Sequence, residues 1–363
     1  MYRAPSGHIV FDLHSDIPAD IALWRAKGEK AVFATRHADR LAASGVRAAV
    51  FALWVEPQYR NAAATRLTQL AGALLADLGE SPERVQLVRT AEELDACLSS
   101  GRFAVMLGVE GMTFVEQWPA DIRLTAQMED RAAEGHAAIL DEQARQSLRL
   151  LSGVGLREAI LVWGERNAIA SGPVPTAQVE DESGGLTDFG GRVVRLCEDL
   201  GVVIDLSHLN EASTNDVLAV AKGTVIASHS NARALCDHPR NLRDEHIKEV
   251  GRRGGVVGIN SYARFVHPDR ATLDRYIDHI VYVAELTGID HVGLGFDFMD
   301  YLPDDLGFPE RTEGLARVED IPQLLQRLSE RGLTDEEIAK VSWQNAARVM
   351  GVVRTKQEVG STC

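Results

Sequence analysis

Three histidines and three acidic residues stand at or just after the ends of apolar runs in this sequence. They are His14, Asp16, Glu110, His208, His229 and Asp297. Imidazole and carboxylate groups are the usual ligands of divalent metals at catalytic sites. Five such ligands are enough for two ions that share Glu110 and a hydroxide, and two ions about 3.5–4 Å apart can sharpen a nucleophile and polarise a carbonyl at once. The set therefore predicts a dinuclear metal site with hydrolytic chemistry.

Taken singly, each of these residues has a simpler interpretation. His14 and Asp16 bracket Ser15, so an extended strand would point both side chains to one face, but a hydrogen-bonded pair is the more frequent explanation. Glu110 follows the apolar run 103–109 and could bridge two ions, cap a helix or form a salt bridge. The prediction of a metal site therefore rests on the whole set meeting in space.

His208 and His229 form the strongest pair in the set. Each ends an apolar run with Ser-His, which would set two imidazoles side by side on successive strands. A neutral imidazole is a common zinc ligand, and a purely structural role is hard to sustain for both together with His14. Asp297 could be a ligand, a structural acid or a general base for metal-bound water, and we favour the general base.

Eight apolar runs, separated by helical patterns, must position these residues. The predicted strands are residues 8–13, 48–54, 103–109, 159–163, 202–207, 224–228, 255–259 and 292–296. Helices are predicted at residues 63–78, 90–98, 187–200, 210–221, 272–286 and 334 to about 350. This alternation is typical of βα units, and a parallel barrel gathers its strand ends at one face. We expect a single (β/α)8 TIM-like barrel domain over residues 1–363, with long active-site loops at 171–185 and 300–309.

The bulk composition narrows the classes of partner. A formal charge of -15, from 38 basic and 53 acidic residues, argues against nucleic acid and anionic membranes. The four cysteines, Cys97, Cys197, Cys236 and Cys363, match no zinc knuckle or disulfide framework, so we expect reduced, mostly buried thiols. No apolar stretch precedes the first predicted strand and no run is long enough to span a bilayer. We therefore expect a cytoplasmic protein with no membrane partner.

Seven motifs occur in an order that points to one family. They are Asp12-Leu-His-Ser-Asp-Ile-Pro18, Gly108-Val-Glu-Gly111, Gly185-Leu-Thr-Asp-Phe-Gly190, Val203-Ile-Asp-Leu-Ser-His208, Ala227-Ser-His-Ser-Asn231, His238-Pro-Arg-Asn241 and Gly293-Leu-Gly-Phe-Asp297. With these motifs the chain resembles the membrane (renal) dipeptidase family of binuclear zinc peptidases, a branch of the amidohydrolase-type metal barrels. The resemblance covers essentially the whole chain.

This resemblance implies a zinc dipeptidase that cleaves small dipeptides, including those with a D-residue on the C-terminal side, and that holds two Zn²⁺ per chain. The implied ligands are His14, Asp16 and Glu110 for one ion, and Glu110, His208 and His229 for the other. Arg240 would bind the free carboxylate of the dipeptide, because its planar fork donates two parallel hydrogen bonds. Asp297 would take a proton from the bridging water and pass it to the leaving amine, so Asp297 and Glu110 are the expected catalytic residues.

One departure from the family pattern lies in the expected substrate site. The family usually ends the strand predicted at 159–163 with Leu-Thr-His, and that histidine helps to polarise the substrate, whereas this chain reads Leu161-Val-Trp163. Asn167 and Ala170 still fit the pattern, so we expect Trp163 and Asn167 in substrate-binding positions. Because tryptophan accepts no hydrogen bond, either the zinc ions polarise the substrate alone or the substrate differs.

Other interpretations stay open. A metal-dependent amidase or lactamase acting on N-acyl amino acids or cyclic amides would use the same metal core, and Trp163 gives it some weight. A non-catalytic relative would keep the fold for binding, but the presence of all six core residues argues against it. A structural zinc site is disfavoured, because such sites normally use cysteine and histidine. The resemblance also leaves open whether the chain forms a homodimer.

Overall fold

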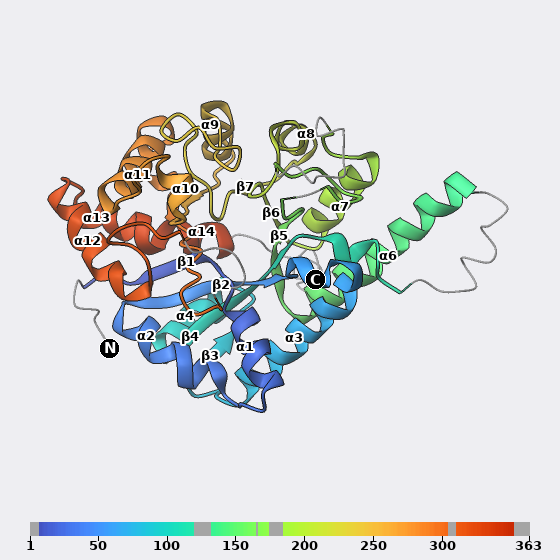
Figure 1. Ribbon diagram of the computed structural model, residues 1–363, viewed down its shortest axis with the longest axis horizontal. Helices are drawn as coiled ribbons and strands as arrows, with labels where there is room; N and C mark the ends of the chain where they lie inside the picture. Colours follow the sequence, from blue (N-terminus) through green and yellow to red (C-terminus); the bar gives the residue numbers. More distant parts are fainter. Residues whose placement is uncertain (1–6, 120–131, 165, 174–183, 304–309, 352–363) are drawn as a thin grey trace, which may run out of the picture.

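The central sheet is built from parallel strand pairs (Figure 1). The computed structural model describes residues 7–119, 132–164, 166–173, 184–303 and 310–351. The strands are β1 (Val10–Ser15), β2 (Val46–Trp54), β3 (Val85–Leu87), β4 (Phe103–Glu110), β5 (Leu156–Ile160), β6 (Val203–Asp205), β7 (Val225–Ile226), β8 (Val257–Ile259) and β9 (Val292–Leu294). Their residues are mostly apolar and buried, as expected for parallel strands that are covered on both faces.

Eight of these strands close into a barrel. Their order is β7-β6-β5-β4-β2-β1-β9-β8, and a parallel bridge between Ala227 and Val257 joins the end of β7 to β8. β3 lies off this path and pairs with the first part of β4, before β5 takes over that edge at Leu107. The predicted (β/α)8 TIM-like barrel is confirmed. β3 was not predicted, because three residues are too few to show a pattern.

Helices alternate with the strands and surround them (Figure 1). They are α1 (Ile17–Ala26), α2 (Ala38–Ala43), α3 (Ala63–Gly79), α4 (Ala91–Ser99), α6 (Ala132–Val154), α7 (Asp188–Asp199), α8 (Glu211–Val220), α9 (Asp244–Arg252), α10 (Ala263–Val266), α11 (Leu273–Thr287), α12 (Ile321–Glu330), α13 (Asp335–Ala339) and α14 (Asn345–Gly351). The first five predicted helices correspond to α3, α4, α7, α8 and α11. Four of these begin at a Thr or Asn side chain that accepts a backbone N–H. The last predicted helix is divided into α13 and α14 by a π-helical turn at Lys340–Gln344.

β5 begins three residues before its predicted start. The prediction followed the apolar run from residue 159 and excluded Arg157 and Glu158, yet both of these side chains are buried within the strand. Beyond the end of β5 the chain still runs beside β4, since the Met112 N–H donates to the carbonyl oxygen of Leu161 at 3.1 Å. Trp163 therefore lies past the strand and not, as predicted, at its last position.

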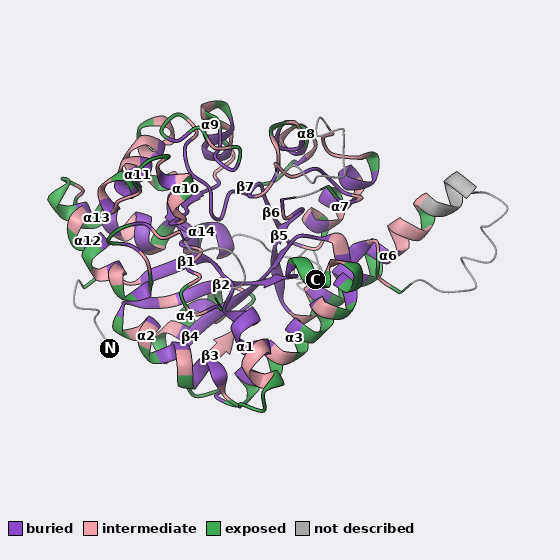
Figure 2. Ribbon diagram, in the orientation of Figure 1, coloured by how far each residue is buried: buried purple, intermediate pink, exposed green. Residues whose placement is uncertain are grey.

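An apolar core fills the inside of the barrel, whose strands are almost entirely buried (Figure 2). The strands contribute Phe11, Leu13, Ala48, Val50, Ala104, Met106, Val203 and Ile226 to this core, and α14 contributes Ala346, Val349 and Met350. Val256, which directly precedes β8, also belongs to it. The core is thus a packed cluster of side chains that α14 covers at one end, as in other barrels of this class.

Parts of both predicted active-site loops, residues 174–183 and 304–309, lie outside the described residues, as does Cys363. The other three cysteines are buried free thiols, as predicted. In the part of the chain that the structure describes, none of the helices combines the length and the apolar character that a bilayer crossing requires.

Candidate metal centre

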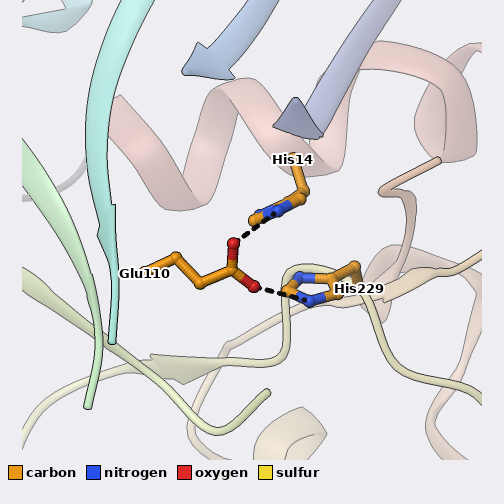
Figure 3. Close-up of side chains that lie close together, drawn as sticks. All are labelled: His14, Glu110 and His229. Carbon is orange, nitrogen blue, oxygen red and sulfur yellow. Dashed lines mark ion pairs between the residues drawn. The ribbon is translucent and has the colours of Figure 1, made fainter. Parts of the chain in front are cut away.

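Glu110 lies in the middle of a cluster of imidazoles at the strand ends (Figure 3). Glu110 ends β4, His14 is the fifth residue of β1 and His229 follows β7, and their side chains point toward one another. Oε2 of Glu110 is 3.4 Å from Nε2 of His14, and Oε1 is 3.6 Å from Nε2 of His229. The three residues are far apart in the sequence, so it is the closure of the parallel barrel that brings them together.

His208 completes this side of the cluster. Its Nε2 is 2.8 Å from Oε1 of Glu110 and 2.9 Å from Nε2 of His229. The backbone of His208 is left-handed, with φ of 67°, a conformation that non-glycine residues rarely adopt and that occurs often at functional sites. The two Ser-His strand ends thus place their imidazoles side by side.

Asp16 and Asp297 form a second group around His14. One ligand atom from each of His14, Asp16 and Asp297 lies within 4.8 Å of the others, and the same holds for His14, Glu110 and His229. Nε2 of His14 is 3.9 Å from Oδ1 of Asp16. All six side chains singled out from the sequence therefore gather at one end of the barrel. In this geometry His14 belongs to both groups, whereas the family resemblance makes Glu110 the shared residue.

The polar atoms of the cluster fit divalent metal ions. Among the described residues, both ring nitrogens of His14 and Oδ1 of Asp16 are buried without a hydrogen-bond partner, an arrangement that is unfavourable in a folded protein. A cation would give these atoms a partner. A cation could also be bound by the Nε2 atoms of His208 and His229, which face each other. A donor set of imidazole nitrogens and carboxylate oxygens without cysteine is typical of catalytic metal sites.

Burial keeps two of the imidazoles in the neutral form that binds metals. Burial and the nearby Arg240 lower the pKa of His208 to about 4. Burial and the neighbouring His14 lower the pKa of His229 well below its usual value. Burial opposes ionisation of Glu110, but the adjoining His14 and His208 lower its pKa, so this residue is a carboxylate. The cluster therefore combines the carboxylate of Glu110 with two neutral nitrogen ligands, His208 and His229.

A buried carboxylate, Asp205, forms hydrogen bonds with both of the Ser-His segments that follow β6 and β7. It ends β6 and accepts the backbone N–H of Ser207 at 2.8 Å and that of Ser228 at 3.1 Å. These two serines immediately precede His208 and His229. Asp205 therefore fixes the relative position of the two imidazoles, a supporting role of the kind that orients metal ligands.

Asp12 links β1 to the segment after β9 by hydrogen bonds of the same kind. Its Oδ1 accepts the backbone N–H of His14 at 3.2 Å and that of Phe296 at 3.0 Å, and burial raises the pKa of Asp12 to about 7. Neither Asp12 nor Asp205 was given a role from the sequence. The feature that could have identified them is their position, two or three residues before a candidate histidine ligand.

Asp297 follows β9 and also has a left-handed backbone, with φ of 56°. The Nδ2 group of Asn260 donates a hydrogen bond to Oδ2 of Asp297 at 3.0 Å. Burial raises the pKa of this carboxyl group, although Asp297 keeps partial contact with solvent. A partly accessible carboxyl group with a raised pKa beside the ligand cluster is suited to proton transfer.

Arg240 is a buried cation next to the histidines. Its Nη2 donates to the carbonyl oxygen of His229 at 3.2 Å and its Nη1 donates to Oγ of Ser230 at 3.4 Å. Its Nε has no hydrogen-bond partner in the described part of the chain, and burial lowers its pKa to about 10. A buried guanidinium with an unused donor is suited to binding an anion.

Trp163 and Asn167 occupy different surroundings. The Trp163 ring stacks on the His208 ring, with centroids 5.9 Å apart, so it borders the cluster. The Asn167 side chain donates to the carbonyl oxygen of Leu161 at 2.9 Å and accepts the N–H groups of Ile169 and Ala170 at 2.9 and 3.1 Å. The amide of Asn167 is thus engaged within its own loop, which favours a role in loop structure over the predicted contact with substrate.

Fungal dipeptidases are similar to much of this chain. An uncharacterized dipeptidase of Schizosaccharomyces pombe is 34% identical over 218 residues, which cover 59% of this chain and 50% of that protein. Dipeptidase ataJ of Aspergillus terreus is 30% identical over 308 residues, which cover 78% of this chain and 67% of that protein. The chain therefore spans about half to two thirds of the length of these relatives.

Solved structures share the barrel. Dipeptidase AC, a metallopeptidase of family M19, superposes with a TM-score of 0.78 at 23% identity, covering 96% of this chain and 99% of that one. A metallopeptidase from Rhodobacter sphaeroides, bound to a phosphinate mimic of L-Ala-D-Ala, has the same TM-score and identity and is covered over its full length. The family model of the membrane dipeptidases, peptidase family M19, matches residues 4–134 and 132–361. On this match, which confirms the resemblance in the motifs, the chain belongs to the membrane dipeptidase family.

Proposed function

We propose that this protein is a metal-dependent dipeptidase that holds two zinc ions and hydrolyses small dipeptides, including those with a C-terminal D-residue. The observation that carries the proposal is the position of Glu110, whose carboxylate lies between His14 on one side and the pair His208 and His229 on the other. Membership of the membrane dipeptidase family supports the activity. The dipeptide mimic in the Rhodobacter sphaeroides structure supports the substrate class.

In the proposed centre, Glu110 is shared between the two ions. His14 and Asp16 would complete the ligands of one ion, and His208 and His229 those of the other. When bound, the ions would polarise the scissile carbonyl and lower the pKa of a water molecule. Zinc is favoured because histidine and carboxylate are its usual ligands at catalytic sites.

Asp297 is proposed to carry the proton. Its carboxyl group is held by the amide of Asn260 and lies in the same group of side chains as His14 and Asp16. From this position it would accept a proton from the attacking water and deliver it to the leaving amine. Glu110 would contribute to catalysis as a ligand of the ions.

Trp163 is proposed to form an apolar wall of the substrate pocket. One face of the site is covered by its ring, which stacks on His208, and the guanidinium of Arg60 lies 4.9 Å from the ring centroid. The indole group can donate only one hydrogen bond and accepts none. It would therefore position the substrate by contact and leave polarisation of the carbonyl to the ions.

Arg240 is proposed to bind the free carboxylate of the dipeptide. The Arg240→Met variant is expected to raise KM about tenfold to a hundredfold, because a hydrogen bond to a charged group is worth about 1.5–3 kcal/mol. Steady-state kinetics with a dipeptide substrate measure this change. The matched control is Arg243→Met, which removes an exposed arginine paired with Glu211 and should leave KM unchanged. An unaltered KM in Arg240→Met would rule out this role.

A substrate panel with metal analysis tests the proposed function. The purified protein should contain about two zinc ions per chain, hydrolyse L,L- and L,D-dipeptides, lose activity with a chelator and recover it with Zn²⁺. Full activity without metal would contradict the proposal. Turnover of N-acyl amino acids or cyclic amides, with no dipeptide hydrolysed, would favour the amidase or lactamase alternative.

The single-domain organisation, the cytoplasmic location and the homodimer stay predictions.

A further inference from the structure

Glu158 is a fully buried acid inside the barrel that the proposed reaction does not use. It is the third residue of β5 and has no solvent exposure. A Cβ atom added to Gly108, on the neighbouring strand β4, would lie 2.3 Å from Oε2 of Glu158 and 3.0 Å from a methyl group of Val50. The Glu158 carboxyl group therefore points into the barrel interior, where the absence of a side chain at Gly108 makes room for it.

The surroundings of Glu158 favour its uncharged form. Within the described residues, neither of its oxygens has a hydrogen-bond partner. The charged groups that act on it are first the acid Asp205, then His14, which favours the ionised form, and Glu110, which opposes it. Burial and Asp205 together raise the pKa of Glu158 well above its usual range. Asp205 itself already accepts the backbone N–H groups of Ser207 and Ser228, so it acts as an acceptor. A neutral Glu158 has the O–H group that can donate to it.

Glu158 and Asp205 lie on neighbouring strands, and the register of β5 and β6 sets Asp205 opposite Ile160, two residues beyond Glu158 on the same face of the sheet. This position connects Glu158 to the metal centre. Asp205 holds the two strand ends that lead into His208 and His229. We propose that Glu158 is a positioning residue: as a neutral carboxylic acid it donates a hydrogen bond to Asp205, and Asp205 in turn keeps His208 and His229 at the spacing of a shared metal centre. The inference rests on the proposed zinc centre, and it adds a residue that acts on that centre from inside the barrel.

Glu158 is not itself one of the ligands. In the described part of the chain, Glu158 belongs to neither of the two groups of side chains whose possible ligand atoms lie within 4.8 Å of one another. If Glu158 only filled space, an apolar side chain of the same length would serve equally well, although it would offer no hydrogen bond to Asp205. These two alternatives make different predictions for substitutions at Glu158.

Two substitutions separate these alternatives by their effect on zinc affinity. Glu158→Gln keeps the shape and a neutral donor, so zinc affinity, measured by competition with a chromophoric chelator, should stay within about twofold of the original. Glu158→Met keeps the volume but removes the donor, and affinity should fall about tenfold or more, as for other residues that support metal ligands. Met106→Leu, a buried apolar exchange in the same core, is the matched control and should leave affinity unchanged.

A double substitution tests whether Glu158 acts through Asp205. In an Asp205→Ala background, Glu158→Met should cause no further loss of zinc affinity, because the acceptor of the hydrogen bond has already been removed. Unchanged zinc affinity in Glu158→Met would overturn the proposal, as would an equal loss in Glu158→Gln and Glu158→Met. Circular dichroism establishes that each variant is folded.

An infrared measurement on metal-free protein keeps this inference separate from the proposed function. Other buried acids, such as Asp12, can contribute to the C=O stretching band of protonated carboxylic acids, so the spectrum of Glu158→Gln is subtracted from that of the original protein. At neutral pH the difference spectrum should contain this band. If the difference spectrum lacks the band, Glu158 is ionised and the inference is wrong. Should the original protein bind no zinc, the proposed function fails, while the band still decides the state of Glu158.

Discussion

The Glu110→Gln variant is expected to lose both its metal ions and its activity. Glutamine keeps the size of the side chain but is neutral and offers one acceptor oxygen, whereas Glu110 uses one oxygen toward His14 and the other toward His208 and His229. Lewis-acid stabilisation by a bound metal is worth several kcal/mol, and each 1.36 kcal/mol is a factor of ten in rate. We therefore expect kcat/KM for a dipeptide to fall about 10³-fold or more.

Metal analysis and kinetics on the same preparation check this result. Glu313→Gln is the matched control, since Glu313 is an exposed glutamate paired with Arg270, and it should retain metal and activity. A folded Glu110→Gln protein that still holds two zinc ions and hydrolyses dipeptides at a similar rate would refute the shared role of Glu110.

The Asp297→Asn variant is expected to keep its zinc and lose turnover. Asparagine tolerates the left-handed backbone found at Asp297, so the local fold should persist, but an amide cannot accept and return a proton. Because general acid–base catalysis contributes about 10²–10⁴-fold, kcat should fall by about that factor while KM changes little. The five remaining candidate ligands should hold the ions.

Zinc content and kcat of Asp297→Asn separate a proton carrier from a ligand. Asp300→Asn is the control, because Asp300 lies three residues further on and pairs with Arg40 at 2.6 Å. If Asp297→Asn loses zinc together with activity, Asp297 is a ligand and the assignment as general base is wrong. If kcat is unchanged, Asp297 has neither role.

The barrel could be predicted because its strands are buried on both faces and read as separate apolar runs. The prediction missed β3 and shifted β5 where this signal was weak. Arg157 and Glu158 interrupt the apolar run of β5, although both are buried. A local sequence pattern cannot show that an ionisable residue is buried when distant residues make room for it, as Gly108 does for Glu158.

The candidate ligands could be proposed from sequence because each follows a strand, and parallel strands end at one face. The residues that support the ligands, Asp12 and Asp205, could not be proposed in this way. Asp12 and Asp205 act on the N–H groups of strands that are distant in sequence, so their partners appear only once the strands are in register. Asn167 followed the family pattern, yet its hydrogen bonds within the loop could be seen only in three dimensions.

The close approach of Gly108 and Glu158 also restricts how this barrel can evolve. A methyl group at residue 108 would collide with the Glu158 carboxyl group, and neither group can retreat into solvent. Alanine at 108 would therefore require the Glu158 side chain to move or to be replaced by a shorter one. Residues 108 and 158 should therefore change together among descendants of this chain, because their side chains compete for the same space.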